Sequence, residues 1–192
     1  MTQRLSHFLT CCLLLALTFL TFAPTRVHAA EGVEVVQAHL ERSDDGYKLS
    51  TTFSFDLNHG LEDVINKGIA LFFKTEVELK RPRWYWLDER TVTESQTVRI
   101  QFNVLTRQYH VSINDRPQQR FATLEDALSL VRRPSRWVVA EFGKLKVGET
   151  YNAAVRMKLD LAELPKPFQV HALNSSDWRL SSDWKHFNFK AD

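Results

Sequence analysis

The chain has 192 residues, of which 25 are basic and 23 acidic, so its formal net charge is +2 at pH 7 with neutral histidines. A net charge this close to zero argues against a protein that its overall charge attracts to nucleic acid or to an anionic membrane. It does not exclude a local charged patch. Both cysteines, Cys11 and Cys12, lie in one apolar run near the amino terminus. The rest of the chain therefore has neither a disulfide framework nor thiolate chemistry.

Residues 1–29 have the layout of a secretory signal peptide. Arg4 precedes a 15-residue apolar run, and Val27 and Ala29 stand three and one positions before an expected cut. The run is shorter than the about 20 residues that cross a bilayer as a helix. We therefore expect cleavage after Ala29, a periplasmic location and no stable membrane anchor; an uncleaved anchor is the alternative. Cleavage removes Arg4 and Arg26 and no acid, which leaves 23 basic residues (25 less these two) against 23 acidic ones.

Residues 30–192 are expected to form a single domain, because no low-complexity or Pro/Gly/Ser-rich linker divides them. Most of this stretch alternates between apolar and polar residues with a period of two, which predicts strands with one buried face. The predicted strands cover residues 33–42, 47–58, 69–79, 98–104, 109–113 and 151–161. Hairpin turns are expected at residues 43–46 and 106–108. Shorter candidate strands are residues 84–87, 136–142 and 168–173, and a last segment through Trp178 or Phe187.

Two segments predict helices. Residues 123–133 place apolar side chains on one helical stripe, with Thr123 as N-cap, acidic residues in the first turn and Pro134 after the end. A shorter helix is expected between Asn58 and Gly68. Many antiparallel strands with two short helices favour a mainly β protein, an antiparallel β-sandwich with immunoglobulin-like connections. A closed barrel is the alternative, and no βαβ alternation supports a nucleotide-binding sheet.

No catalytic motif is visible in the sequence. The nucleophile elbow, the phosphate-binding glycine loops and the zinc-protease helix are all absent. The five histidines after residue 29 are scattered, with no two within four positions, so they form no local metal pair. Neighbouring carboxylates such as Glu125 and Asp126 are accounted for by caps and turns. We expect no enzymatic activity, no metal site and no cofactor.

Two clusters combine basic and aromatic residues and form a candidate interaction surface. Cations and stacking faces together suit a sugar, an anionic glycan or an acidic segment of a partner protein. The surface comprises Arg81, Arg83, Trp84, Tyr85 and Trp86, with Arg133 and Arg136 as a second spot. The alternative is structural, with Trp84 and Trp86 in the core and Arg133 at a helix end.

The tetrad Ser-Ser-Asp-Trp occurs twice near the carboxyl end, which sets Trp178 and Trp184 six residues apart. An even spacing places both indoles on one face of an extended segment, and the Pro-Lys-Pro stretch at 165–167 disfavours helix before it. Asp177 and Asp183 are expected to bond nearby backbone N–H groups in Asx turns. We therefore interpret these four residues as structural; a ligand platform is the alternative.

The stretches LPKPFQVHAL (residues 164–173) and DWRLSSDW (177–184) resemble the end of an exported Gram-negative family, the domain of unknown function 4390. The likeness extends to the signal peptide, the start at residues 33–40 and the segment 81–86. This resemblance implies no activity, cofactor or catalytic residue. It does imply frequent gene placement beside a membrane sensor kinase of the nitrogen-regulation type. We therefore expect a non-enzymatic partner of an envelope or sensor protein; the alternative is a glycan-binding module that uses the tryptophans.

Overall fold

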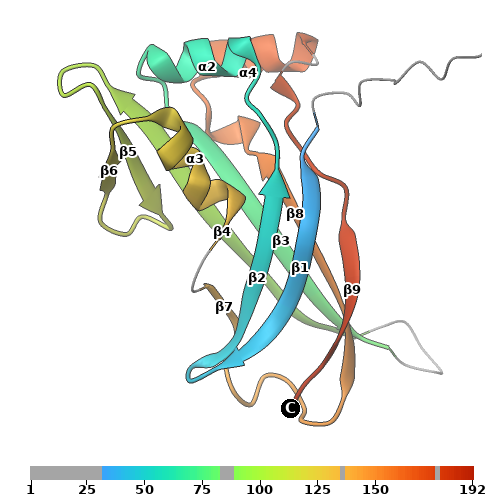
Figure 1. Ribbon diagram of the computed structural model, residues 1–192. Coiled ribbons are helices and arrows are strands. Elements are labelled where there is room, and N and C mark those ends of the chain that lie inside the picture. The colour runs from blue at the N-terminus through green and yellow to red at the C-terminus, as the bar shows by residue number, and fades with distance from the viewer. Residues whose placement is uncertain (1–31, 83–88, 135–136, 176–177) are drawn as a thin grey trace, which may run out of the picture. The chain divides into compact units, whose positions relative to one another are not determined.

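Two antiparallel sheets make up most of the computed structural model, which describes residues 32–82, 89–134, 137–175 and 178–192 (Figure 1). The side chains of His171, Leu173 and Asn174 are outside this description. So are the predicted signal peptide and the candidate strand at residues 84–87. All described residues belong to one unit, residues 31–192.

The smaller sheet has the strand order β1-β2-β7, and the larger one has the order β6-β5-β4-β3-β8-β9. The strands of the smaller sheet are β1 (Glu34–Ser43), β2 (Gly46–Ser54) and β7 (Trp137–Ala140). Those of the larger sheet are β3 (Leu71–Arg81), β4 (Glu89–Asn103), β5 (Gln108–Ile113), β6 (Gln119–Phe121), β8 (Thr150–Leu159) and β9 (Lys185–Lys190). The prediction of a mainly β, antiparallel two-sheet fold is confirmed. The immunoglobulin-like connections stay a prediction. In the larger sheet β3, β4, β5 and β6 are neighbours in the same order as in the sequence.

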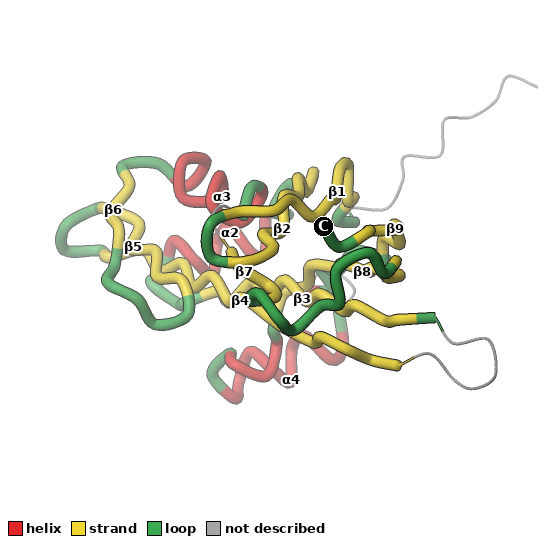
Figure 2. The backbone as a smooth tube through the Cα atoms, turned by 90° about the horizontal axis from the view of Figure 1, so that it is seen from below, coloured by secondary structure: helices red, strands yellow, loops and turns green. Residues whose placement is uncertain are grey.

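The core lies between the sheets and is filled by every second residue of their strands. On β2 the buried side chains include Tyr47, Leu49 and Phe53, and on β3 they include Phe73 and Val77. At one lateral edge β1 lies beside β9 (Figure 2). At the other edge the helix α3 contacts β2, β4, β5 and β6. The polar residues that alternate with these buried ones lie on the opposite face of the six-stranded sheet, as expected for an antiparallel sheet with one solvent-exposed face.

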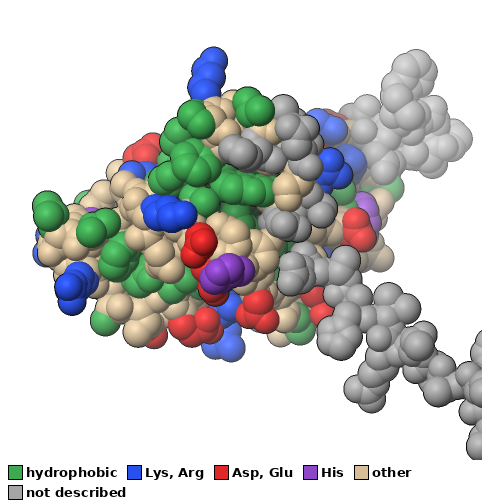
Figure 3. Space-filling model, turned by 90° about the horizontal axis from the view of Figure 1, so that it is seen from above, with side chains coloured by type: hydrophobic (Ala, Val, Ile, Leu, Met, Phe, Trp, Pro, Cys, Tyr) green, Lys and Arg blue, Asp and Glu red, His purple; other side chains and the backbone are tan. Residues whose placement is uncertain are grey.

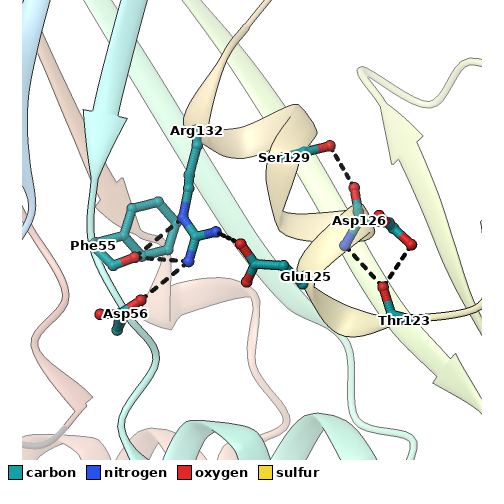
Figure 4. Close-up of polar contacts among 7 residues, drawn as sticks. All are labelled: Phe55, Asp56, Thr123, Glu125, Asp126, Ser129 and Arg132. Carbon is teal, nitrogen blue, oxygen red and sulfur yellow. Dashed lines mark hydrogen bonds and ion pairs between the residues drawn. The ribbon is translucent and has the colours of Figure 1, made fainter.

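Two of the three α-helices in the described ranges match the sequence predictions. In α2 (His59–Asn66) the Asn58 side chain accepts a hydrogen bond from the Leu61 N–H at 3.0 Å. In α3 (Leu124–Arg132) the Thr123 hydroxyl accepts one from the Asp126 N–H at 3.1 Å. Figure 4 shows this cap together with Arg132, which reaches from the last turn of α3 to the end of β2. These caps satisfy N–H groups that have no partner within the helix.

The prediction of a strand at residues 168–173 is wrong, because α4 occupies Lys166–Asn174. It follows a short 3₁₀ turn, η1 (Leu161–Glu163). Pro165 is the N-cap with extended backbone, and a proline occupies the first helical turn. A proline there loses no helical hydrogen bond, so the Pro-Lys-Pro stretch begins a helix as readily as it prevents one. Figure 2 shows α4 on the side of the six-stranded sheet away from β1 and β2.

The end of the molecule that carries α2 and α4 displays hydrophobic side chains among charged ones (Figure 3). The turn between β4 and β5 contributes Val104 and Leu105, which are 61% and 95% exposed. Isolated surface aliphatics are common, and we assign these no role. In the described part of the chain no helix is long and apolar enough to span a membrane.

Candidate functional site

The structure describes only two residues of the sequence-predicted interaction surface. Arg81 ends β3, where its guanidinium pairs with Glu89 at the start of β4. Arg133 is the C-cap of α3 and is exposed. The remaining residues of that surface lie outside the described ranges; they are Arg83, Trp84, Tyr85, Trp86 and Arg136. The structure gives no contact between these two described arginines, and their role in an interaction surface stays a prediction.

The arginine with a structural role at the end of α3 is Arg132, in the last turn of the helix. Its side chain is 19% exposed. The Nε and Nη2 atoms donate to the Phe55 carbonyl oxygen at 3.2 and 2.9 Å, and the guanidinium lies 5.3 Å from the Phe55 ring centroid. Glu125 and Asp56 add ion pairs (Figure 4). Arg132 therefore fastens α3 to the chain that follows β2.

Trp178 and Trp184 do not share a face, so that prediction is wrong. Trp178 packs against the core beside Phe168, whereas Trp184 lies on the polar side of the six-stranded sheet. Ser182 N–H donates to the Met157 carbonyl, and Lys185 pairs with Val155. The chain advances three residues from Ser182 to Lys185 while β8 advances only two, from Met157 to Val155. The extra residue is a bulge, and it moves the side chains that follow Ser182 to the opposite face of the sheet. Asp183 is exposed, and Asp177 lies outside the described residues.

The polar side of the six-stranded sheet carries two adjoining hollows that share Lys74, and we name them together the outer groove. The first hollow, about 330 Å³, is lined by Phe72 and Lys74 of β3, by Arg99 of β4 and by the carboxylates Asp115, Asp160 and Glu163. The second, about 320 Å³, includes Lys74, Glu76, Glu78, Ser95, Arg156 and Trp184. Residues from β3, β4 and β8 meet here because β3 pairs with both of the other strands.

Glu76 is the centre of the charge network in the outer groove. Its carboxylate lies 2.6 Å from Arg156 Nε, 3.0 Å from Lys158 Nζ and 4.0 Å from Lys74 Nζ. Partial burial alone would raise the pKa of Glu76, but the hydrogen bonds and positive charges of Arg156 and Lys158 outweigh it and lower the pKa. The carboxylate is therefore ionised in the folded protein at neutral pH.

Two arginines of the outer groove also stack on aromatic rings. The Arg156 guanidinium lies 4.4 Å from the Trp184 ring centroid, and that of Arg99 lies 5.9 Å from the Phe72 centroid. Such cation–π contacts hold an arginine side chain over a ring while leaving N–H groups at its edge.

At the other end Glu78 pairs with Lys80 at 2.9 Å and with Arg90 at 3.8 Å. The groove thus presents positioned charges suited to noncovalent recognition.

Replacing Glu76 with glutamine should lower the free energy of unfolding by about 1–2 kcal/mol at pH 7, because charged hydrogen bonds at a half-buried position are lost. The folded pKa of Glu76 is lowered, so its stabilisation is complete above the ordinary value of 4.5 and disappears as pH falls through the folded value. The difference between the native protein and the variant should therefore shrink below pH 4.5. Urea unfolding from pH 7 to acid measures this.

The control for this prediction is Glu41→Gln, which changes an exposed carboxylate on β1 and should cost less than about 0.5 kcal/mol. A Glu76→Gln penalty that stays constant down to strongly acidic pH would contradict the proposed ion pairing.

Among the described residues, no three His, Cys, Asp or Glu side chains lie close enough together to hold a metal ion. Fold and groove together define a two-sheet antiparallel β protein with an open, charge-bearing sheet face. The chain belongs to the family described as domain of unknown function (DUF4390), whose model matches residues 30–188. That match confirms the resemblance drawn from the carboxyl-terminal motifs. No curated protein and no solved structure matches the chain.

Proposed function

We propose that this protein is exported to the periplasm and acts there as a non-enzymatic interaction module. Its partner in this proposal is another envelope protein, such as the periplasmic part of a membrane sensor kinase. The observation that carries the proposal is the outer groove, where ion pairs position charged side chains beside two open hollows. A solvent-exposed face of a β-sheet with charges held in place suits recognition of a partner by electrostatic complementarity.

Export is supported by the leader-like layout of residues 1–29, and the sensor-kinase partner by the gene placement that the family resemblance implies. The groove is lined by β3 residues that alternate with the buried Phe73 and Val77, so it lies on the face of the sheet turned away from the core, where a partner can approach without disturbing that core.

The proposal predicts that tagged protein comprising residues 30–192 retains an envelope protein from crosslinked envelope extract. Excess untagged protein added before the crosslinker should prevent this retention, and the partner should capture this protein in the reciprocal experiment. Mass spectrometry identifies the partner. If no envelope protein passes both tests, the interaction proposal is contradicted.

Glycan binding is the second candidate function, and the observation that favours it is the half-exposed indole of Trp184 at the second hollow. Aromatic rings beside polar side chains commonly receive sugars, although Arg156 already stacks on this ring. The glycan proposal predicts a saturable change in tryptophan fluorescence on titration with soluble cell-wall fragments, and loss of that change in Trp184→Leu. A flat titration would eliminate this candidate.

A further inference from the structure

We infer that an extended segment of the partner protein adds as a strand to the free edge of β4, residues 92–96, with a lysine or arginine of that segment facing Glu94. This inference rests on the proposed interaction function and adds to it the mode of binding and the chemistry of the partner.

β4 is longer than the strand that pairs with it on one of its sides. β3 pairs with β4 over residues 89–100, whereas β5 pairs with it only over residues 98–103. Asn114 extends that second pairing by one residue, because its N–H donates to the Thr97 carbonyl at 2.9 Å and its Oδ1 accepts from the Thr97 N–H at 2.8 Å. Figure 1 shows β4 continuing past the end of β5. The rest of that side of β4 is a sheet edge.

The main chain of this edge carries hydrogen-bonding groups without partners. In an antiparallel sheet, alternate residues of a strand direct their N–H and C=O to the same side. Because Thr97 directs both groups toward β5, Thr93 and Ser95 direct theirs the same way, and no described residue hydrogen-bonds to them. β7 contacts β4 but pairs with β2. Unpaired groups in this arrangement are a template for another strand.

The edge lacks the features that commonly prevent strand addition, which are proline, lysine or a bulge. Residues 92–97 read VTESQT, and the irregularity in the β3–β4 pairing lies before them, between Val92 and Arg90. Short pairings are also sufficient in this fold, since β6 has three residues and β7 has four. An added segment of about five residues, roughly 17 Å long, therefore fits the free edge.

Glu94 determines the charge of the segment. It pairs with the fully buried Val77, so its side chain starts on the core side of the sheet, where it is half-buried. No described cation pairs with it. A carboxylate held partly out of water without a counter-charge is unfavourable. A lysine or arginine opposite Glu94 on an added strand would supply that charge as a cross-strand pair.

Glu94 also argues against a second copy of this chain at the edge. Residues 92–98 contain no lysine or arginine, so another β4 edge offers Glu94 no cation. A foreign strand with a basic residue does. Its side chains on the other face would lie beside Thr93 and Ser95, which line the second hollow of the outer groove. The partner would thus enter the groove from its β4 side.

A synthetic peptide that alternates threonine with valine, with one lysine in place of the central valine, tests this inference. Its ends are blocked, and the comparison peptide has glutamate instead of lysine. Amide hydrogen exchange of residues 30–192 is followed by NMR. The Thr93 and Ser95 amides should exchange rapidly in the free protein and at least about tenfold more slowly with the lysine peptide at millimolar concentration. The Glu94 and Gln96 amides, which face β3, should change little.

The variant Glu94→Lys should weaken binding of the lysine peptide about tenfold and favour the glutamate peptide instead. Its matched control is Glu41→Lys, the same change at an exposed residue of β1, which should leave both peptides unaffected. A second variant, Thr93→Pro, removes an outward N–H without removing a hydrogen bond to β3. It should abolish the protection of the Ser95 amide.

Unchanged exchange at Thr93 and Ser95 with the lysine peptide would overturn the inference without any variant having to fold. Equal protection by both peptides, or equal effects of Glu94→Lys and Glu41→Lys, would also overturn it, since Glu94 would then select nothing. If the pull-down yields the same envelope partner with native and Thr93→Pro protein, the interaction function stands and only the strand addition fails. If no partner is retained at all, the interaction function itself fails.

Discussion

Replacing Gly46 with alanine is expected to lower the free energy of unfolding by about 2–5 kcal/mol, the largest effect of any substitution considered. Gly46 joins β1 to β2 with φ +138°, a conformation that side-chain-bearing residues rarely adopt. An added Cβ would lie 2.2 Å from the Ala140 carbonyl oxygen and 2.9 Å from the Glu141 Cα. Both atoms are backbone at the end of β7, so relief of the overlap requires the β2–β7 pairing to shift.

Gly148→Ala is the matched control for the Gly46 prediction. Gly148 also has a positive φ, +84°, but an added Cβ there would meet nothing within 4 Å. Its cost should be limited to backbone strain, about 1 kcal/mol. Urea unfolding of both variants measures the difference. Equal losses of stability would show that the close approach of Gly46 to β7 is wrong.

Arg132→Met should be the second most destabilising change, at about 2–3 kcal/mol. The partners Asp56 and Glu125 are 99% and 74% exposed, so their ion pairs contribute little. The larger contribution comes from the two N–H groups donated to the Phe55 carbonyl, because methionine removes a charged donor and leaves that half-buried acceptor unsatisfied. The loss should also loosen α3 from β2.

The exposed neighbour Arg133 provides the control for this second prediction. Arg133→Met should change the free energy of unfolding by less than about 0.5 kcal/mol. Chemical denaturation gives the free energies, and hydrogen exchange of α3 amides reports whether the helix opens more readily. Similar behaviour of both variants would contradict the anchoring role of Arg132.

Period-two alternation was sufficient to predict β2, β3 and β8, because each contributes alternate side chains to one core. Capping chemistry likewise predicted α2 and α3. The three residues of β6 are too few to show a period, so this strand could not be predicted from the sequence. Proline is excluded from the interior of a helix but is favourable in its first turn. At Pro167 only the tertiary structure decides whether the chain is extended or begins a helix.

The outer groove was only partly predictable. The alternation predicted for residues 69–79 implies that Lys74, Glu76 and Glu78 share the polar face of one strand, and the structure confirms this. The sequence did not show that Arg99 and Arg156 lie on the strands either side, because the order β4-β3-β8 depends on pairing between segments far apart in the chain. The inserted residue before β9 then brought Trp184 to this face, against the alternation expected from its spacing.

Site-specific photo-crosslinking in living cells tests whether the outer groove is the surface that contacts an envelope partner. A photoreactive residue replaces Ser95, an exposed residue that lines the outer groove, or Glu41, an exposed residue of β1 on the other sheet. We expect an adduct between the Ser95 position and one envelope protein, and no such adduct from the Glu41 position. An adduct of equal yield from both positions, or none from Ser95, would contradict the assignment of the outer groove as the interaction surface.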